Sequence, residues 1–376
     1  MVPRPIAPML AILDGTRNAD ALRTGFLLRT GIQLDSSQVD AFIKSLDDAF
    51  LLDNQRFQGA MAKVMDNYHA GPFRPSSLAG NSYPSNGDEL REAFDDYCSN
   101  ANADAGGQVL KDGDAGSKRI AGLISPHIDY NRGWRTYAET WQLAHKAVED
   151  AELIILLGTD HSGSPGRLTL TRQDYATPWG QLPTDTSLVD GLVEILGEDG
   201  AFQEEVHHIG EHSVELASVW LHYFAGGKPK RMLPILCGVD ENLVEKGAET
   251  NGVLQDALSF LADVVAEQNT LVVAAGDLSH VGPAFSGSLP LDLAGKARIR
   301  TSDEEWLEVA CTGSSERLAD HMRSKGDATR ICGASPIRYM LAILPETRGE
   351  VVAYDQCPAD EQFGSLVSIA GVLFTE

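Results

Sequence analysis

Apolar residues recur at helical spacing in the first part of the chain. Within residues 37–50 the apolar positions lie three or four residues apart, as on the buried side of a helix. Residues 19–28 show the same spacing, and Ser36-Ser37 offers hydroxyl groups that can cap the helix that follows. Residues 51–57 are expected to close a small ribbon. We therefore interpret residues 1–65 as a small helical module of the winged-helix type.

From residue 119 onward the pattern changes, because short continuous apolar runs alternate with amphipathic segments. Continuous apolar runs are typical of parallel strands that are buried on both faces. The expected strands are 120–124, 152–157, 168–170, 232–237, 270–275, 351–355 and 366–374. The expected helices are 88–98, 134–149, 186–196, 214–224, 253–267, 303–311, 315–323 and 336–343. This alternation predicts that residues 70–376 form an α/β domain with a mostly parallel central sheet and helices on both faces.

Charge is distributed unevenly between these two parts. The chain has 30 Lys and Arg against 54 Asp and Glu, a formal net charge of −24. Only 7 of the basic and 8 of the acidic residues lie within residues 1–70, so almost all of the excess belongs to the larger domain. A surface this acidic repels phosphate groups. We therefore expect neither nucleic acid nor an anionic membrane as a partner.

The chain start and the cysteines point to the cytoplasm. Residues 1–15 contain early prolines and an Asp where a signal peptide needs an apolar core. The longest apolar runs are too short to span a bilayer. The 5 cysteines are odd in number, widely spaced and without a CxxC pair. We expect a reducing compartment and no disulfide framework.

Three of the expected strands lead within a few residues to a histidine. These histidines are His127, His161 and His280, and Asp277 lies in the third of the polar clusters. A single histidine after a strand is more often a structural residue. Three in matching positions favour a shared pocket, because ligands bind outside the carboxyl ends of the strands in open α/β sheets.

Two further clusters carry residues of chemical interest. His207-His208 is followed by Glu211, His212 and Glu215, which open a helix with His212 and Glu215 on one face of it. Their alternative role is a capping box that orders the start of the helix. Cys332 lies in the loop before another helix, where its thiolate could ligate a metal or act as a nucleophile. Its alternative role is that of a small buried apolar residue.

Several common catalytic motifs are absent from the sequence. It contains no GxGxxG, P-loop, GxSxG or HExxH pattern, which lowers the weight of nucleotide-dependent and serine-hydrolase chemistry. The histidines outside these clusters are expected to be structural or exposed: His69, His145, His222 and His321.

Taken together, the clusters resemble a known family. The segments SPHIDY, LLGTDHSG, EHSVE, PILCG, AAGDLSH and ICGASPI follow one another along the chain. In this order and spacing they resemble the Memo family, including its bacterial members, the B component of a system with a radical-SAM enzyme (AmmeMemoRadiSam). The resemblance covers about residues 70–376. It implies a three-layer α/β/α fold like that of the class III extradiol dioxygenases, which use non-haem iron.

The resemblance also implies roles for individual residues. It assigns three metal ligands: His127, His161 and Cys332. It equates His280 with the acid/base histidine of the dioxygenases and places Asp277, Glu211 and His212 in the same pocket.

The sequence departs from the family pattern at three positions. Asp129 follows the first motif histidine where the family has Gly, which would add a carboxylate near the metal. The stretch that begins at Leu78 lacks the histidine that the family has near its N-terminus, so it cannot supply a ligand. Ser162 stands where some members have a second histidine.

Two main hypotheses follow from these observations. One is a redox-active metalloprotein, a dioxygenase-like oxidoreductase that holds iron or copper. The other is a module that binds a peptide or a partner such as a radical-SAM enzyme, without catalysis of its own. A third hypothesis, hydrolytic zinc chemistry, fits the His/Cys ligand set. Residues 1–65 loosely resemble peptide-recognition modules of the PqqD type, which favours the binding role.

Overall fold

The chain divides into two compact units. The computed structural model describes residues 5–104, 118–240, 243, 252–344 and 346–376. The first unit is Met1–Ala70 and the second is Gly71–Glu376. Each unit has a hydrophobic core of its own. We describe them one after the other.

The first unit is helical throughout its described part. It contains η1 (Ala7–Ile12), α1 (Ala19–Thr30), α2 (Ser36–Asp48) and α3 (Gln55–Ala70). Its core is formed by the buried side chains Met9, Ile12, Leu22, Phe26, Leu34, Val39, Phe42 and Leu46. Its members in α1 and α2 are apolar positions of the helical pattern, so the periodicity predicted both helices.

Two local predictions for this unit were wrong. Residues 5–70 contain no strand, and the expected ribbon at 51–57 is a loop followed by the start of α3. The side chain of Asn54 accepts hydrogen bonds from the backbone N–H groups of Arg56 and Phe57, and this starts a helix instead. The cap of α2 is Asp35, whose carboxylate accepts the Gln38 N–H, and not the serines that follow it. Residues 5–70 therefore contain no wing.

The second unit is built around an eight-stranded sheet. Its strands are β1 (Ile120–Ser125), β2 (Leu153–Thr159), β3 (Leu168–Leu170), β6 (Met232–Cys237), β7 (Thr270–Ala275), β8 (His280–Val281), β9 (Arg348–Pro358) and β10 (Leu366–Thr375). The order is β3-β6-β2-β7-β1-β10-β8, with β9 paired to β10. The central strands β6, β2, β7 and β1 are parallel, and antiparallel pairs flank them. A separate ribbon pairs β4 (Tyr175–Thr177) with β5 (Gly180–Leu182).

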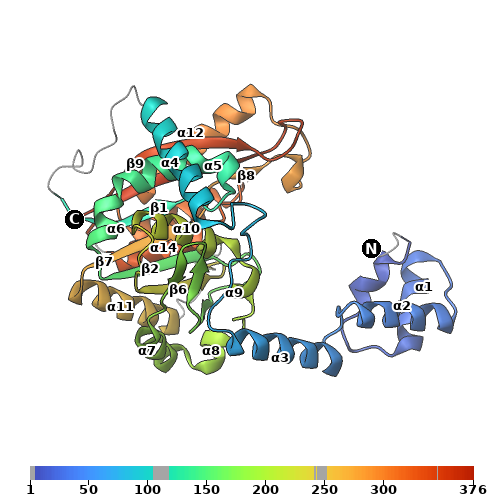
Figure 1. Ribbon diagram of the computed structural model, residues 1–376. Coiled ribbons are helices and arrows are strands. Elements are labelled where there is room, and N and C mark those ends of the chain that lie inside the picture. The colour runs from blue at the N-terminus through green and yellow to red at the C-terminus, as the bar shows by residue number, and fades with distance from the viewer. Residues whose placement is uncertain (1–4, 105–117, 241–242, 244–251, 345) are drawn as a thin grey trace. The chain divides into compact units, whose positions relative to one another are not determined.

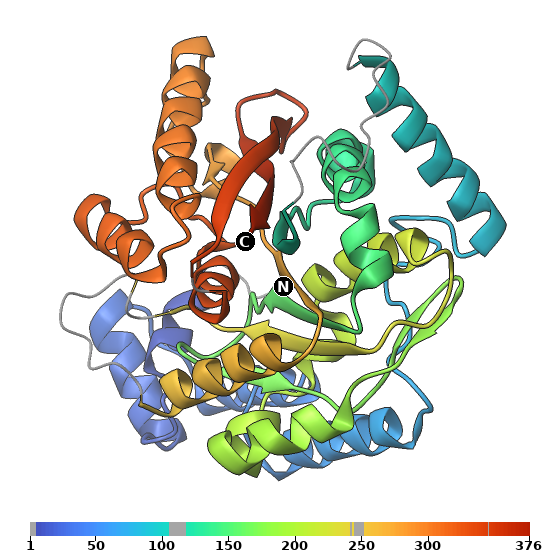
Figure 2. The same ribbon diagram turned by 90° about the vertical axis from the view of Figure 1, so that its left-hand side faces the viewer.

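Helices cover both faces of this sheet (Figures 1 and 2). The helices are α4 (Gly87–Asp104), α5 (Tyr130–Leu143), α6 (His145–Asp150), α7 (Thr186–Leu196), α8 (Glu198–Phe202), α9 (His207–Gly210), α10 (His212–Phe224), α11 (Gly252–Glu267), η3 (Pro283–Phe285), α12 (Leu293–Ala310), α13 (Ser315–Lys325) and α14 (Ala334–Ile343). This three-layer arrangement confirms the predicted fold class. Within the described residues, no helix has both the length and the apolar character needed to cross a membrane.

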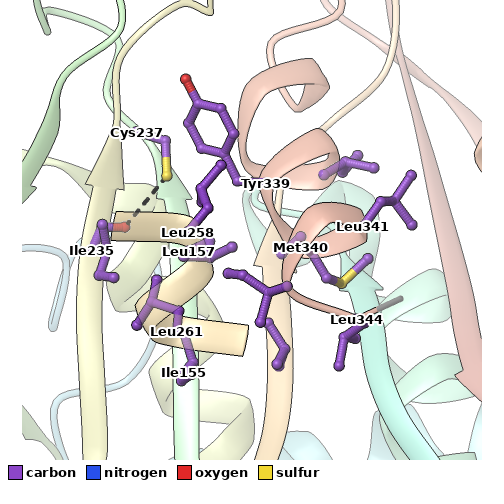
Figure 3. Packing of buried hydrophobic residues seen from close by; sticks show 14 of the residues in the cluster. Ile155, Leu157, Ile235, Cys237, Leu258, Leu261, Tyr339, Met340, Leu341 and Leu344 are labelled. Carbon is purple, nitrogen blue, oxygen red and sulfur yellow. Dashed lines mark hydrogen bonds between the residues drawn. The ribbon is translucent and has the colours of Figure 1, made fainter. Parts of the chain in front are cut away.

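Alternation along the central strands decides which helices pack on which face. Ile155 and Leu157 of β2 pack against α11 and α14 (Figure 3). Their neighbours Ile154 and Leu156 belong to the opposite core, with α4, α5 and α10. Successive side chains of a strand point to opposite faces, so a central strand needs apolar residues at every position.

One buried ion pair joins the start of this unit to α10. Arg74 and Glu215 are both fully buried, and their side chains form a salt bridge. Arg74 also donates to the carbonyl oxygens of His208 at 2.7 Å and Glu211 at 3.0 Å. Burial opposes ionisation of Glu215, but the charge of Arg74 and hydrogen bonds from Tyr83 and Arg74 hold its pKa below the usual value. Arg74 therefore fixes the turn between α9 and α10.

We predict that Arg74→Met destabilises the protein by about 3–5 kcal/mol, because it leaves the Glu215 charge buried without its partner. The double variant Arg74→Met/Glu215→Gln should lose less, because it removes the charge as well. Urea unfolding followed by circular dichroism measures both. The exposed pair Lys146–Asp150 supplies the control Lys146→Met, with a loss within about 1 kcal/mol. Equal losses for Arg74→Met and Lys146→Met would contradict the prediction.

Candidate metal centre

Parallel pairing brings three of the predicted site residues to one edge of the sheet. Strand β7 lies between β1 and β2 and is parallel to both. His127, His161 and Asp277 each follow one of these strands by two residues. Parallel neighbouring strands end at the same edge, so these residues meet there.

Close approach of two glycines places Cys332 over the same edge. A Cβ atom on Gly333 would lie 2.8 Å from the Cα of Gly276 and 2.9 Å from the carbonyl oxygen of Asp277. The Gly333 N–H donates to that carbonyl at 2.9 Å. The hydroxyl of Thr159 donates to the carbonyl of Cys332 at 3.1 Å. The loop before α14 can therefore sit directly on the ends of β2 and β7.

Two imidazoles and one thiol converge at this point. The Sγ atom of Cys332 lies 3.2 Å from Nε2 of His127. The ring centroids of His127 and His161 are 5.1 Å apart. One ligand atom from each of these three residues lies within 4.8 Å of the other two. Among the described residues, this group has the donor set and spacing that a tetrahedral metal site with an open position requires.

His127 is held in the orientation of a metal ligand. Its Nδ1 lies 3.1 Å from the carbonyl oxygen of Ala275 and donates to it, so Nε2 carries the lone pair that faces Cys332. Its backbone N–H donates to Oδ1 of Asp277 at 2.8 Å. Burial lowers the pKa of His127 to about 4, although the charge of Asp277 acts in the opposite direction. At neutral pH the imidazole is therefore unprotonated and available to a cation.

Glu211 orients the other two histidines. Its Oε2 lies 3.0 Å from Nδ1 of His161, and its Oε1 lies 3.1 Å from Nδ1 of His212. The same carboxylate caps α10 by accepting the N–H groups of His212 and Ser213. Burial would lower the pKa of His161, but the hydrogen bond and charge of Glu211 outweigh burial and raise it. Against the same opposition from burial, the two histidines hold the pKa of Glu211 well below its usual range.

The pKa of the Cys332 thiol is raised, both by burial and by a neighbouring carboxylate. Burial raises the pKa of Cys332 well above its ordinary value, and the nearby charge of Asp277 adds to this rise. Its Sγ–H donates to the carbonyl of Asp277 at 3.6 Å. A bound cation would offset both causes, because a coordinating thiol is deprotonated. The residues therefore fit a metal that binds with release of the thiol proton.

His280 lies at a different part of the edge. It belongs to β8, which pairs with β10, and its backbone N–H donates to the carbonyl of Thr329 at 2.7 Å. In the described part of the chain, His280 makes no hydrogen bond with His127, His161 or Cys332. The structure thus brings six predicted site residues into one connected network and leaves His280 beside it: His127, His161, Glu211, His212, Asp277 and Cys332.

Comparison with known proteins identifies the family of this chain. The model of the Memo family, described as Memo-like protein, matches residues 74–373. The chain belongs to the Memo family. A MEMO1 family protein of Aquifex aeolicus is 25% identical over 374 residues, 97% of this chain and 90% of the relative. One from Thermus thermophilus is 26% identical and covers 90% of this chain and 93% of its own. One from Methanosarcina barkeri is 25% identical, and the match covers 80% of this chain and 97% of the relative.

Asp129, which departs from the Memo pattern, has a structural role at the start of α5. Asp129 does not extend the metal ligands, because it caps α5 by accepting the Arg132 N–H at 3.2 Å. Its carboxylate also forms a salt bridge of 2.6 Å with the Arg132 guanidinium. It is absent from the groups of metal-ligand spacing among the described residues. The carboxylate that was expected near the metal is therefore engaged at the start of α5.

The segment without the Memo histidine has a structural role. The backbone N–H of Leu78 donates to Oε1 of Glu215 at 2.9 Å, and the hydroxyl of Tyr83 donates to the same atom at 2.5 Å. The segment thus saturates the carboxylate that holds Arg74. It binds to α10 through the backbone of Leu78 and the hydroxyl of Tyr83, for which a histidine is not needed.

Sequence reasoning missed one further group. Asp160, Glu204 and His207 also lie at metal-ligand spacing. The carboxylate of Asp160 lies 2.9 Å from Nδ1 of His207, and Glu204 accepts the backbone N–H of Ser164 at 3.0 Å. The one signal in the sequence is that Glu204 and His207 are three residues apart. Within the protein these contacts hold the loop after β2.

We predict that Gly333→Ala weakens metal binding about tenfold or more, because the added methyl group pushes Cys332 away from His127. The fold should persist, since the strain is confined to the loop before α14. Gly252→Ala is the matched control, because a Cβ atom there meets nothing within 4 Å. Competition with a chelator of known affinity measures the change. Equal affinities for both variants would show that the glycine contact does not position the thiol.

Proposed function

We propose that this Memo protein is a redox-active metalloprotein whose site is formed by His127, His161 and Cys332. The observation that carries the proposal is the orientation of the two imidazoles. Each has its Nδ1 engaged, by a carbonyl oxygen in His127 and by Glu211 in His161, so both present Nε2 for coordination. Metal-binding histidines commonly have such a partner on the second nitrogen.

The donor set favours iron or copper. Thiolate and imidazole together suit copper(I), whereas two imidazoles with open positions suit iron(II) chemistry with dioxygen. Either metal, when bound, would supply one-electron chemistry and a binding position for substrate or dioxygen. Zinc fits the same ligands and would support hydrolysis instead. We favour an oxidoreductase of the dioxygenase-like type over the hydrolytic alternative because the Memo fold resembles that of the non-haem iron dioxygenases.

The remaining residues of the pocket have supporting roles in this proposal. Glu211 keeps His161 and His212 aligned, and Asp277 holds the backbone of His127. His280 serves as the general acid/base, because its Nδ1 faces the carbonyl oxygens of Leu278 and Arg330. Those carbonyls assign the proton to Nδ1, so Nε2 is the basic nitrogen. All five cysteines are free, as expected in the reducing cytoplasm that we propose for this protein.

The proposal predicts near-stoichiometric iron or copper in protein purified without oxygen or chelator. Cys332→Ser should lose most of this metal, because one of three ligands is removed. Cys311→Ser is the matched control, since Cys311 is a partly buried free thiol outside the site. His280→Gln should keep the metal and lose acid/base activity. Elemental analysis by mass spectrometry measures the content. A wild-type protein that stays empty after addition of each metal would refute the proposal.

A second candidate function is partner or peptide binding through the first unit. Among the described residues, the exposed large apolar side chains of that unit are Leu10, Leu27, Leu28, Ile32, Phe50, Leu51 and Val64. Those of the much larger second unit number only six. Exposed apolar side chains concentrated in a small unit favour an interaction surface. A peptide or a radical-SAM enzyme is the partner that the family resemblance suggests.

We therefore expect that deletion of residues 1–65 abolishes capture of the partner and leaves the metal content unchanged. Leu28→Asp in the full-length chain is a milder test, because Leu28 is 81% exposed and its replacement should not affect folding. Co-purification with the radical-SAM enzyme of the AmmeMemoRadiSam system measures capture. Capture that survives both changes would contradict the binding role of this unit.

A further inference from the structure

Asp303 is a buried carboxylate that the proposed metal centre does not use. It lies on α12 and is 1% exposed. Its Oδ1 accepts the hydroxyl of Ser279 at 2.5 Å, and its Oδ2 accepts the hydroxyl of Tyr354 at 2.8 Å. The hydroxyl of Ser368 is a third hydrogen-bond partner. Burial raises the pKa of Asp303, and these hydroxyl groups partly offset the rise. Burying a carboxylate costs free energy unless it is hydrogen-bonded. The groups that bond to Asp303 therefore show which part of the chain it holds.

Its contacts fix the peptide that precedes His280. Ser279 and Ser368 are paired in both directions, because the Ser279 N–H donates to Oγ of Ser368 and the Ser368 N–H donates to the Ser279 carbonyl, each at 2.9 Å. The Leu278 N–H donates to the Ser368 carbonyl at 2.8 Å. Asp303 anchors the side chains of both serines. The backbone from Leu278 to His280 therefore has little freedom to rotate.

This peptide in turn determines which ring nitrogen of neutral His280 carries the proton. Nδ1 of His280 lies 3.0 Å from the carbonyl oxygen of Leu278 and 3.2 Å from that of Arg330. Both partners can only accept, so the neutral ring must carry its proton on Nδ1. A free imidazole of histidine prefers the proton on Nε2. The two carbonyls reverse that preference and leave Nε2 with the lone pair of a base.

We propose that Asp303 is a positioning residue for His280. By holding Ser279, it keeps the Leu278 carbonyl in place as an acceptor and thereby selects the ring form in which Nε2 is basic. The functional value of this arrangement rests on the proposed acid/base role of His280. The arrangement itself is independent of any bound metal.

The test is the ¹⁵N spectrum of the imidazoles in the full-length, metal-free protein at a pH where they are neutral. Selective ¹⁵N-histidine labelling separates the two nitrogens of each ring, and His280→Gln assigns the signals of His280. The wild type should show a protonated Nδ1. Asp303→Asn cannot accept all three hydroxyl groups, and Ser279→Ala removes the contact outright. Both should move His280 toward the form protonated on Nε2.

Two controls separate positioning from general structural damage. Tyr354→Phe removes the hydrogen bond to Oδ2 of Asp303, together with the one that its hydroxyl accepts from Gln356, and should leave His280 unchanged. Ser279→Thr retains the hydroxyl and should keep the wild-type ring form. If Asp303→Asn fails to fold, Ser279→Ala alone decides, because it deletes a single atom beyond Cβ.

The outcomes distinguish this inference from the proposed metal function. An unchanged Nδ1–H in folded Asp303→Asn and Ser279→Ala overturns it. Displaced His127 signals in both variants also overturn it, because Asp303 would then support the whole pocket and not His280 in particular. A wild-type protein that binds no metal refutes the proposed function but leaves the ring form of His280, and its dependence on Asp303, as measured.

Discussion

The geometry of the site depends on the Glu211 carboxylate, which performs two tasks at one position. It caps α10 and accepts from the imidazoles of His161 and His212. Moving α10 would therefore move both rings. The start of α10 is itself anchored to the sheet, because the Ser213 hydroxyl donates to the carbonyl of Thr159 at the end of β2. It is fixed from the side by Arg74, which donates to the Glu211 carbonyl.

This dependence explains the role of the buried ion pair between Arg74 and Glu215, which are not among the candidate metal ligands. Replacing such a pair with apolar residues of similar volume is often neutral or stabilising, so stability alone does not require Arg74 and Glu215. Arg74 and Glu215 instead contribute hydrogen bonds of fixed direction. A guanidinium has donors in a fixed planar arrangement, and Arg74 uses them on Glu215 and on the carbonyl oxygens of His208 and Glu211. An apolar residue could fill the space but could not set the angle of the turn that carries Glu211.

Much of the fold was predictable because buried parallel strands are apolar at every position. The bounds of the parallel strands β6 and β7 were predicted correctly for this reason. The start of α12 was not, because Lys and Arg interrupt the apolar positions of residues 293–302 and Leu293 itself is 86% exposed. The helix begins there because the side chain of Asp292 caps it. Capping contacts act over three residues and leave no periodic signal.

The candidate site was predictable to a similar extent. The rule that ligands gather at strand ends located His127, His161 and Asp277, since it depends only on the order of elements. The roles of Arg74 and Asp303 could not be predicted because their partners are distant in sequence. Arg74 and Glu215 are 141 residues apart. The supporting role of Glu211 was expected from the resemblance, whereas its contact with two histidines required the folded chain. Residues that follow strand ends or belong to a local motif can thus be predicted, whereas Arg74 and Asp303 act through contacts that the local sequence does not reveal.

The charges of the pocket argue for the order in which ligands bind. Glu211 and Asp277 place two carboxylates beside the histidines, and the pKa of Glu211 is held low enough to keep it ionised. Such a pocket, in a chain of net charge −24, attracts cations and repels anions. A substrate that carries a carboxylate or phosphate would therefore gain affinity only after a cation had bound. Because the same cation would release the thiol proton of Cys332, metal uptake should precede substrate binding and become more favourable as the pH rises.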